Sequence, residues 1–440
     1  MDLLKKASKE VDSAEVFGIR GHSVPVKFES GELESVKAVE TIGKALRVIH
    51  NGRLGFSSTT DLESQDTLIE RAKATAKLGE SAGFEFPDSG KADELPTSDP
   101  AVSELSPADL VEIGKRVIKR IEEFDDELEL NLNLTRSKDE VRVQNSNGLA
   151  QEEQRTSVSA SLTVKDVKEG DIFSFRETES ARKLEDFEPD SLVDRAIQKL
   201  KWAQRETKIE SGTYPVLFTS RGTLVLLVPL LAGFNGKNVY QGTSPLGEKL
   251  GREVFSEELT LIDHGSIEGS PARRSFDDEG LPVGRIPLIK EGTVENFLYD
   301  LQTAGMADRE PTGNGLKGGL ISGGDFRSPP STGPTSLLVG PGEKTIGRMI
   351  SDVDTGLLVD QVLGLGQGNT LSGEFSNNVS VAYRIENGEI KGKVKNTMIA
   401  GNVYELLDGN LEIGKEGEWI GGGLKSPPVA LSGVNVVQKG

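Results

Sequence analysis

The chain has 440 residues, a formal net charge of −19 and no cysteine. The lack of cysteine excludes disulfide bonds and thiolate ligands and fits a protein of the cytoplasm. The acidic balance, without a run of Lys and Arg, argues against direct binding to nucleic acid, which usually needs a basic patch.

Residues 1–210 alternate helix and strand patterns. Apolar residues at helical or alternating spacing predict helices at 2–13, 61–79, 107–121 and 189–204, and strands at 14–20, 24–28, 33–38, 42–50, 128–135, 140–145, 153–164 and 172–177. The segment 81–107 is rich in Gly, Ser and Pro and is predicted to be a linker. We therefore expect two α+β subdomains of related plan, at about 1–85 and 106–210.

From residue 211 onward the chain is Gly-rich and carries short apolar strands. This composition predicts a mainly β domain at 211–440, so the expected fold class is α+β overall. The apolar run 224–232 is far shorter than the roughly 20 residues that a membrane span needs, and we expect a buried core element there. We also expect a short helix that begins or breaks at Pro229, because proline has no N–H to donate. No signal peptide or membrane span is expected, which again predicts a cytoplasmic protein.

Metal-binding and nucleophilic motifs are missing from the sequence. The three histidines, His22, His50 and His264, are far apart, and no H-x-x-x-H or H-E-x-x-H is present. The common nitrogen and sulfur frameworks for zinc are therefore absent, and no Ser/His/Asp triad is indicated. We predict no catalytic residue and no zinc ligand in this chain, while an oxygen-only cation site stays open.

Three consecutive acids, Asp277, Asp278 and Glu279, precede a glycine. In a strand, Asp277 and Glu279 would share one face and could form an acid/base pair or a cation site. The favoured alternative is a charged turn whose carboxylates accept backbone N–H bonds.

Two Gly-rich stretches are candidate peptide-binding backbone. They lack the G-x-x-x-x-G-K-[ST] pattern of a phosphate loop, and plain connecting loops are the alternative. Glycine lets another chain come close, and an extended peptide can bind through main-chain hydrogen bonds. The candidate residues are Thr312, Gly313, Asn314, Gly315, Gly366, Gln367 and Gly368.

Several sequence blocks occur in an order that resembles the TldD/PmbA family, whose PmbA branch is also called TldE. The blocks are S-G-T-Y-P-V-L-F (211–218), G-T-S-P-L-G-E-K-L-G (242–251), L-T-L-I-D (259–263), F-D-D-E-G (276–280), P-T-G-N-G (311–315) and G-L-G-Q-G-N-T-L-S-G-E-F-S (364–376). The resemblance implies a two-subunit zinc metalloprotease. It also favours a structural role near the substrate cleft for Asp277, Asp278 and Glu279. In the catalytic TldD-type members an H-E-x-x-x-H helix occupies the place of the apolar run, and the matching positions here are Pro229, Leu230 and Phe234.

The resemblance, together with the missing motif, implies a non-catalytic subunit of the PmbA (TldE) type that holds unfolded peptides. Zinc is then expected only in a TldD-type partner, with which the chain forms a heterodimer, unless it forms a homodimer. Two alternatives stay open at this point: a stand-alone metal-dependent hydrolase that uses carboxylates, and a homodimeric peptide-binding protein without protease activity. Direct binding to nucleic acid is not expected, although the family also has an older label as a modulator of DNA gyrase.

Overall fold

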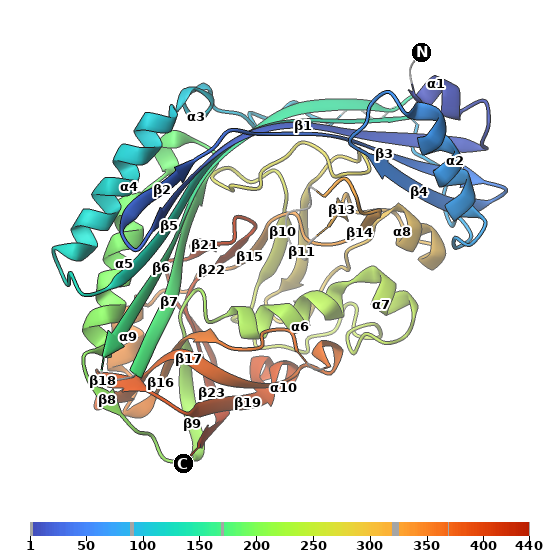
Figure 1. The fold of residues 1–440 in the computed structure, drawn as a ribbon. Coiled ribbons are helices and arrows are strands. Elements are labelled where there is room, and N and C mark those ends of the chain that lie inside the picture. Colours follow the sequence, from blue (N-terminus) through green and yellow to red (C-terminus); the bar gives the residue numbers. More distant parts are fainter. Residues whose placement is uncertain (1–2, 89–91, 169–170, 319–324, 368, 440) are drawn as a thin grey trace.

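A long antiparallel sheet dominates the first half of the chain in the computed structural model, which describes residues 3–88, 92–168, 171–318, 325–367 and 369–439. The strands follow the order β4-β3-β1-β5-β6-β7, and β2 pairs with the C-terminal end of β1. Their bounds are β1 Ser13–Glu29, β2 Glu32–Val36, β3 Val39–His50, β4 Arg53–Thr59, β5 Glu129–Asn145, β6 Ala150–Lys168 and β7 Asp171–Ala181. In Figure 1 these strands run across the top of the molecule and bend down its left side.

Helices cover the outer face of this sheet. Figure 1 shows α4 and α5 against its left side and α2 near the opposite end. Ser106 caps α4 in a capping box with Asp109, as the Ser-Pro sequence there predicts. The helix bounds are α1 Leu3–Ala7, α2 Gln65–Ala76, α3 Pro100–Glu104, α4 Pro107–Glu122 and α5 Pro189–Ala203, with the 3₁₀ turn η1 at Leu184–Asp186.

The second half fills the concave side of the long sheet. One sheet follows the order β16-β9-β23-β19-β17-β18-β8. Because β17 also pairs with β16, the strands from β16 to β17 in this order form a closed ring. Another has the order β12-β11-β10-β15-β22-β21, and β13 pairs with β14. The strand bounds are β8 Glu206–Thr207, β9 Gly212–Phe218, β10 Leu261–His264, β11 Arg285–Lys290, β12 Thr293–Val294, β13 Gly315–Lys317, β14 Pro330–Thr332, β15 Leu337–Val339, β16 Thr355–Val362, β17 Glu374–Glu386, β18 Glu389–Val394, β19 Thr397–Asn402, β20 Leu411–Ile413, β21 Glu418–Ile420, β22 Leu424–Ser426 and β23 Val429–Gln438.

Short helices lie between these strands. Their bounds are α6 Leu224–Phe234, α7 Gly236–Tyr240, α8 Leu301–Ala307, α9 Ile346–Ser351 and α10 Val403–Asp408, with the 3₁₀ turn η2 at Thr370–Ser372. The largest apolar core packs α6 against strands of both C-terminal sheets. The predicted α+β class, with a mainly β C-terminal region, is confirmed.

Several predicted elements differ from the observed ones. The helix predicted at 2–13 ends at Ala7, and the strands predicted at 14–20 and 24–28 are one strand, β1, because β3 and β5 pair along nearly all of it. The strands of the two predicted subdomains join in one sheet through β1 and β5. Within the described residues, no strand before residue 200 pairs with one after it. The helix predicted to begin or break at Pro229 instead runs through it.

No described helix is both long enough and apolar enough to cross a bilayer.

Candidate functional site

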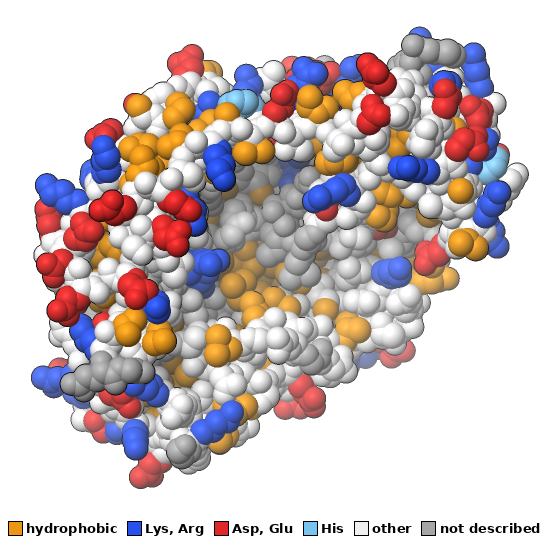
Figure 2. Space-filling model, in the orientation of Figure 1, with side chains coloured by type: hydrophobic (Ala, Val, Ile, Leu, Met, Phe, Trp, Pro, Cys, Tyr) orange, Lys and Arg blue, Asp and Glu red, His pale blue; other side chains and the backbone are white. Residues whose placement is uncertain are grey.

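Helix α6, which contains the positions of the missing motif, borders a hollow in the molecule. Figure 2 shows this hollow in the middle of the face drawn, with hydrophobic side chains on its lower wall, where Figure 1 places α6. Pro229, Leu230 and Phe234 are buried, and the Phe234 ring lies 6.0 Å from that of Phe297. Pro229 removes one backbone donor from the helix, and the Tyr404 hydroxyl donates to the Pro229 carbonyl at 3.2 Å. Tertiary packing therefore keeps the helix continuous in spite of its proline.

The opposite face of α6 is partly open. Leu224, Val228 and Ala232 lie one helical turn apart and are half-buried. Next to them, a Cβ on Gly366 would lie 3.7 Å from Val228, and the loop that holds Gly366 exposes Leu363 by 59% and Leu365 by 39%. Exposed apolar side chains that gather in this way are typical of a surface that contacts a peptide or another protein. We call Leu224, Val228, Ala232, Leu363 and Leu365 the α6 face.

Only part of the second predicted Gly-rich stretch can be placed here. Gly366 and Gln367 are exposed beside the α6 face, and Gly364 and Gly366 both have φ of 74°. Backbone of this conformation is readily adopted only by glycine. Gly368 lies outside the described residues.

The acids Asp277, Asp278 and Glu279 form a turn and are fully buried. The Asp277 carboxylate accepts hydrogen bonds from the backbone N–H groups of Glu279, Leu281 and Gly315 at 2.8–2.9 Å. The turn interpretation thus agrees with the structure. All three side chains have 0% exposure, so a peptide cannot touch them in this conformation, and their place near a peptide cleft stays a prediction.

Burial also changes the protonation of this turn. It raises the pKa of Glu279 to about 7, against the opposing charge of Arg47, and it raises the pKa of Asp277 well above its usual range, together with the neighbouring Glu279 charge. Both carboxyls are therefore easier to protonate than exposed ones. Within the buried turn, these carboxyl groups accept hydrogen bonds from the protein's own backbone.

Two cations from distant parts of the chain accompany the buried acids. Arg47 donates to Glu279 at 2.5 Å and to Glu15 at 2.9 Å, and its guanidinium lies 5.1 Å from the Phe84 and Phe86 rings. This contact ties the long sheet to the C-terminal half. Nothing in the local sequence near residue 47 indicates it, because its partner is 232 residues away.

Lys317 is the second buried cation. Its ammonium lies 5.2 Å from the Phe17 ring and 5.0 Å from the Phe56 ring, and among the described residues no carboxylate forms an ion pair with it. Burial lowers its pKa to about 8. Cation–π contacts thus replace a salt bridge at this position.

The stretch from Thr312 to Gly315 is packed against the protein itself. Asn314 donates to Asp263 at 2.7 Å and accepts from the Thr312 hydroxyl at 2.7 Å. A Cβ on Gly313 would lie 2.4 Å from the Pro282 carbonyl oxygen, and one on Gly315 would lie 2.1 Å from Glu279. The glycines allow close packing of the protein's own chain. Gly313, Asn314 and Gly315 are buried and Thr312 is half-buried, so the peptide contact predicted for this stretch stays a prediction.

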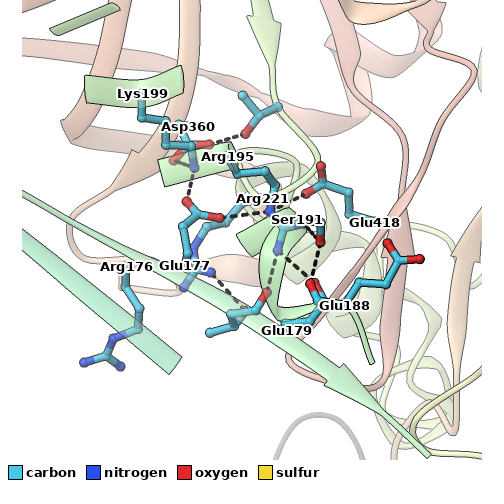
Figure 3. Close-up of polar contacts among 12 residues, drawn as sticks. Arg176, Glu177, Glu179, Glu188, Ser191, Arg195, Lys199, Arg221, Asp360 and Glu418 are labelled. Atoms are coloured by element: carbon cyan, nitrogen blue, oxygen red, sulfur yellow. Dashed lines mark hydrogen bonds and ion pairs between the residues drawn. The ribbon is translucent and has the colours of Figure 1, made fainter. Parts of the chain in front are cut away.

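A second network of charges joins the two halves of the chain (Figure 3). Lys199 of α5 contacts Glu177 of β7, and it donates to Asp360 of β16 at 2.6 Å. Arg195, one turn earlier on α5, binds Glu179 at 2.9 Å. Sequence analysis missed this network, because Lys199 and Asp360 are 161 residues apart and each looks like an ordinary surface charge.

A cavity of about 460 Å³ lies between the inner face of the long sheet and the loop 271–274. Hydroxyl-bearing residues from β6 and β7 make up much of the sheet side of its wall. They are Thr156, Ser157, Ser159, Ser161, Thr178 and Ser180. Its volume falls in the range of roughly 300–1,000 Å³ that is usual for small-ligand pockets.

Comparisons with known proteins give the family. The model of the PmbA/TldA metallopeptidase C-terminal domain matches residues 211–438, that of domain 1 matches 14–78 and that of the central domain matches 100–204. The chain belongs to the PmbA/TldD metallopeptidase family. The resemblance seen in the sequence blocks is thus confirmed.

Individual PmbA/TldD relatives match between 70% and 99% of the chain. The metalloprotease PmbA of Escherichia coli O157:H7 is 25% identical over 433 residues, which cover 94% of this chain and 90% of the relative. The crystal structure of TldE from Thermococcus kodakarensis superposes with a TM-score of 0.90 at 27% identity and covers 99% of both chains. A metalloprotease TldD homolog of Buchnera aphidicola is 27% identical over 336 residues, which cover 70% of this chain and 68% of the relative.

The metal of this metallopeptidase family does not fit the residues present in α6. Pro229, Leu230 and Phe234 carry no nitrogen, oxygen or sulfur in their side chains, and the chain has no cysteine. His22 is exposed on β1, while His50 and His264 end β3 and β10. Across the described ranges, no three His, Asp or Glu side chains converge in a way that could hold a metal ion.

Proposed function

We propose that this chain is the non-catalytic, peptide-holding subunit of a TldD/TldE-type heterodimeric zinc metalloprotease that acts on unfolded peptides in the cytoplasm. The observation that carries the proposal is α6. At the positions that match the H-E-x-x-x-H helix, the chain has Pro229, Leu230 and Phe234, which can neither bind a metal nor transfer a proton.

The α6 face supplies the surface for holding a peptide. Its leucine, valine and alanine side chains offer an apolar strip beside the hollow, and Gly366 and Gln367 leave exposed backbone next to it. Apolar side chains of an extended peptide would be removed from water on this strip, at a gain of about 25 cal/mol per Å² of buried apolar surface. The zinc that polarises the peptide bond is expected in the TldD-type partner.

The stand-alone hydrolase alternative has little support. It would rest on Asp277, Asp278 and Glu279, which are fully buried and bound to backbone N–H groups of this chain. A substrate could reach them only if the turn opened. A homodimeric peptide-binding protein without protease activity remains an outcome that the experiment below separates.

The proposal is tested with the purified chain and with cell extract. Alone, the protein should contain no stoichiometric zinc and cleave no peptide, yet it should bind a fluorescein-labelled unfolded peptide. From the native cell it should copurify with a TldD-type subunit that contains zinc. Leu365→Asp should weaken peptide binding about tenfold, because a charge would be placed on the α6 face.

The matched control is Ile172→Asp, which changes another exposed apolar side chain, 61% exposed against 39% for Leu365, at the start of β7. It should leave peptide binding unchanged. Copurification of the chain only with itself would favour the homodimeric alternative. Zinc-dependent cleavage by the isolated chain would contradict the proposal.

A further inference from the structure

Two arginines near the cavity have side-chain nitrogens without partners. Arg182, just after β7, is 2% exposed, and none of its Nε, Nη1 and Nη2 atoms has a hydrogen-bond partner in the described part of the chain. The Nε and Nη1 atoms of Arg273 are likewise buried and unpartnered there. A buried guanidinium is normally paired, because an unsatisfied buried charge is costly.

The two guanidinium groups also repel one another. Burial and then the charge of Arg273 lower the pKa of Arg182. Three acids oppose this shift, and Asp186 does so most. The other two have partners of their own: Asp99 accepts from the backbone N–H groups of Ala101 and Leu184, and Glu268 pairs with Lys183. Within the described residues no acid hydrogen-bonds to the Nε or Nη1 atoms of Arg182 and Arg273. In a protein of net charge −19, such a pair of cations, one buried and one half-buried, indicates a place for an anion from outside the chain.

The cavity gives that anion a way in. Arg273 lines it, together with Ser180, which lies two residues before Arg182, and Thr156, whose hydroxyl donates to the Arg182 carbonyl at 3.1 Å. The wall has four other charged residues. Arg155 pairs with Glu153, Glu179 with Arg195 and Arg274 with Asp278, while Asp139 faces the charge of Arg155. Arg273 brings two buried nitrogens, unpartnered in the described part of the chain, to this wall, whose hydroxyls come from β6 and β7. Arg182 is close enough for the two charges to interact but is not itself part of the wall.

We propose that Arg182 and Arg273 bind a carboxylate of the held peptide, which enters through this cavity. Guanidinium and carboxylate match in geometry, and charge-assisted hydrogen bonds are about twice as strong as neutral ones. The carboxylate comes either from the C-terminus of the peptide or from an Asp or Glu side chain. This inference rests on the proposed peptide-holding function and names the chemical group that this function recognises.

The test compares three versions of one short labelled peptide of Gly, Ala, Ser and Leu. One ends in a free carboxylate, one ends in an amide, and one ends in an amide but carries an internal Asp. Binding of a carboxylate-bearing version about tenfold tighter than of the plain amide is expected, and the version that gains shows the source of the carboxylate. Arg273→Gln should remove this difference and leave binding of the plain amide unchanged.

Arg285→Gln is the matched control, because Arg285 is exposed on β11 in the same region and does not line the cavity. It should preserve the difference. Equal binding of all three peptides by the unchanged protein would overturn the carboxylate inference and leave peptide holding intact. If no peptide bound, the proposed peptide holding would be contradicted. The carboxylate inference would then be tested by melting the protein in acetate and in chloride at equal ionic strength. Acetate must raise the melting temperature of the unchanged protein but not that of Arg273→Gln.

A stability measurement separates this site from a structural arginine. Without ligand, Arg182→Met should raise the melting temperature by about 2 °C, because it removes an unpaired buried charge while keeping an unbranched side chain. Arg285→Met should change it little. A melting temperature that falls in Arg182→Met would assign Arg182 a structural role and overturn the inference.

Discussion

Lys317 illustrates how a single buried charge can stay in this fold. Its ammonium has aromatic rings on two sides and a carbonyl oxygen, that of Ser328, at 3.5 Å, but no paired carboxylate among the described residues. Such contacts recover only part of the hydration that the charge loses on burial. The residue therefore destabilises the folded state at neutral pH, and the lowering of its pKa to about 8 expresses the same cost.

Replacing this lysine should stabilise the protein. Lys317→Met removes the charge and keeps most of the side-chain volume, so the free energy of unfolding at pH 7 should rise by about 1–3 kcal/mol. Because the unfolded chain binds the proton more tightly than the folded one, this group adds stability as pH rises from about 8 to its ordinary pKa of 10.5. That gain should be absent in Lys317→Met.

The free energy of unfolding, measured in urea at pH 7 and near pH 10, checks this prediction. The control is Lys138→Met, which replaces an exposed lysine on β5. The control should match the unchanged protein at both values. A Lys317→Met variant that is less stable at pH 7, or that keeps the alkaline gain, would show that Lys317 contributes favourable contacts that outweigh its burial.

At the scale of elements, α5 is held to both halves of the molecule by the charges drawn in Figure 3. Lys199 lies between Glu177 of β7 and Asp360 of β16, and all three side chains are at least nine-tenths buried. Although burial alone would raise the pKa of Asp360, the charge of Lys199 lowers it below its usual range. The three groups thus depend on one another, and the loss of one leaves the others uncompensated.

Lys199→Ala should therefore lower the free energy of unfolding by about 3–5 kcal/mol, because two buried carboxylates would lose their shared cation. Lys201→Ala, on the exposed side of the same helix, should change it by no more than about 0.5 kcal/mol. Denaturant unfolding of the two variants measures the difference. Equal effects would mean that the network adds nothing to stability.

Helix α6 should not regain catalysis through histidines alone. In Pro229→His/Phe234→His the glutamate that activates water and a third ligand are still missing, as are the residues that would orient the ligands. We expect no zinc peptidase activity from this double variant, measured by metal content and by cleavage of an unfolded peptide. Zinc-dependent cleavage would show that the site needs less than is argued here.

Local chemistry explains which elements the sequence predicts. Ser106-Pro107 marks the start of α4, and Asn51-Gly52 and Glu291-Gly292 form hairpin turns, each residue with φ between 45° and 76°. Long-range pairing is not visible in this way. The continuity of β1 depends on β5, more than a hundred residues further along, and the continuity of α6 through Pro229 depends on the core around it.

The same limit applies to the candidate site. The acids at 277–279 look like an exposed turn in sequence, and contacts with residues elsewhere in the chain, among them Arg47, Gly315 and Lys317, make them a buried cluster. The α6 positions were found because the order of sequence blocks points to them. The sequence around Arg182 and Arg273 does not indicate this pair. The feature that distinguishes it, buried nitrogens without a hydrogen-bond partner in the described part of the chain, is visible only in the structure.

At the scale of the whole molecule, buried ion pairs join the two halves of the chain, and an apolar face is partly exposed to solvent. Buried charges at Arg47–Glu279 and Lys199–Asp360 connect the long sheet to the C-terminal half at two separate places. The α6 face has half-buried and exposed apolar side chains. Figure 2 shows a hollow in the middle of the face drawn. This arrangement supports the proposed role of a subunit that holds a peptide while another subunit supplies the chemistry.

The most direct test of this account mixes the purified chain with a TldD-type subunit and measures cleavage of an unfolded peptide. We predict that the chain alone is inactive, that the mixture cleaves about tenfold or more faster than the TldD-type subunit alone, and that a zinc chelator abolishes cleavage. Cleavage by the isolated chain with metal bound to its own carboxylates, or a mixture no faster than the TldD-type subunit alone, would contradict the account.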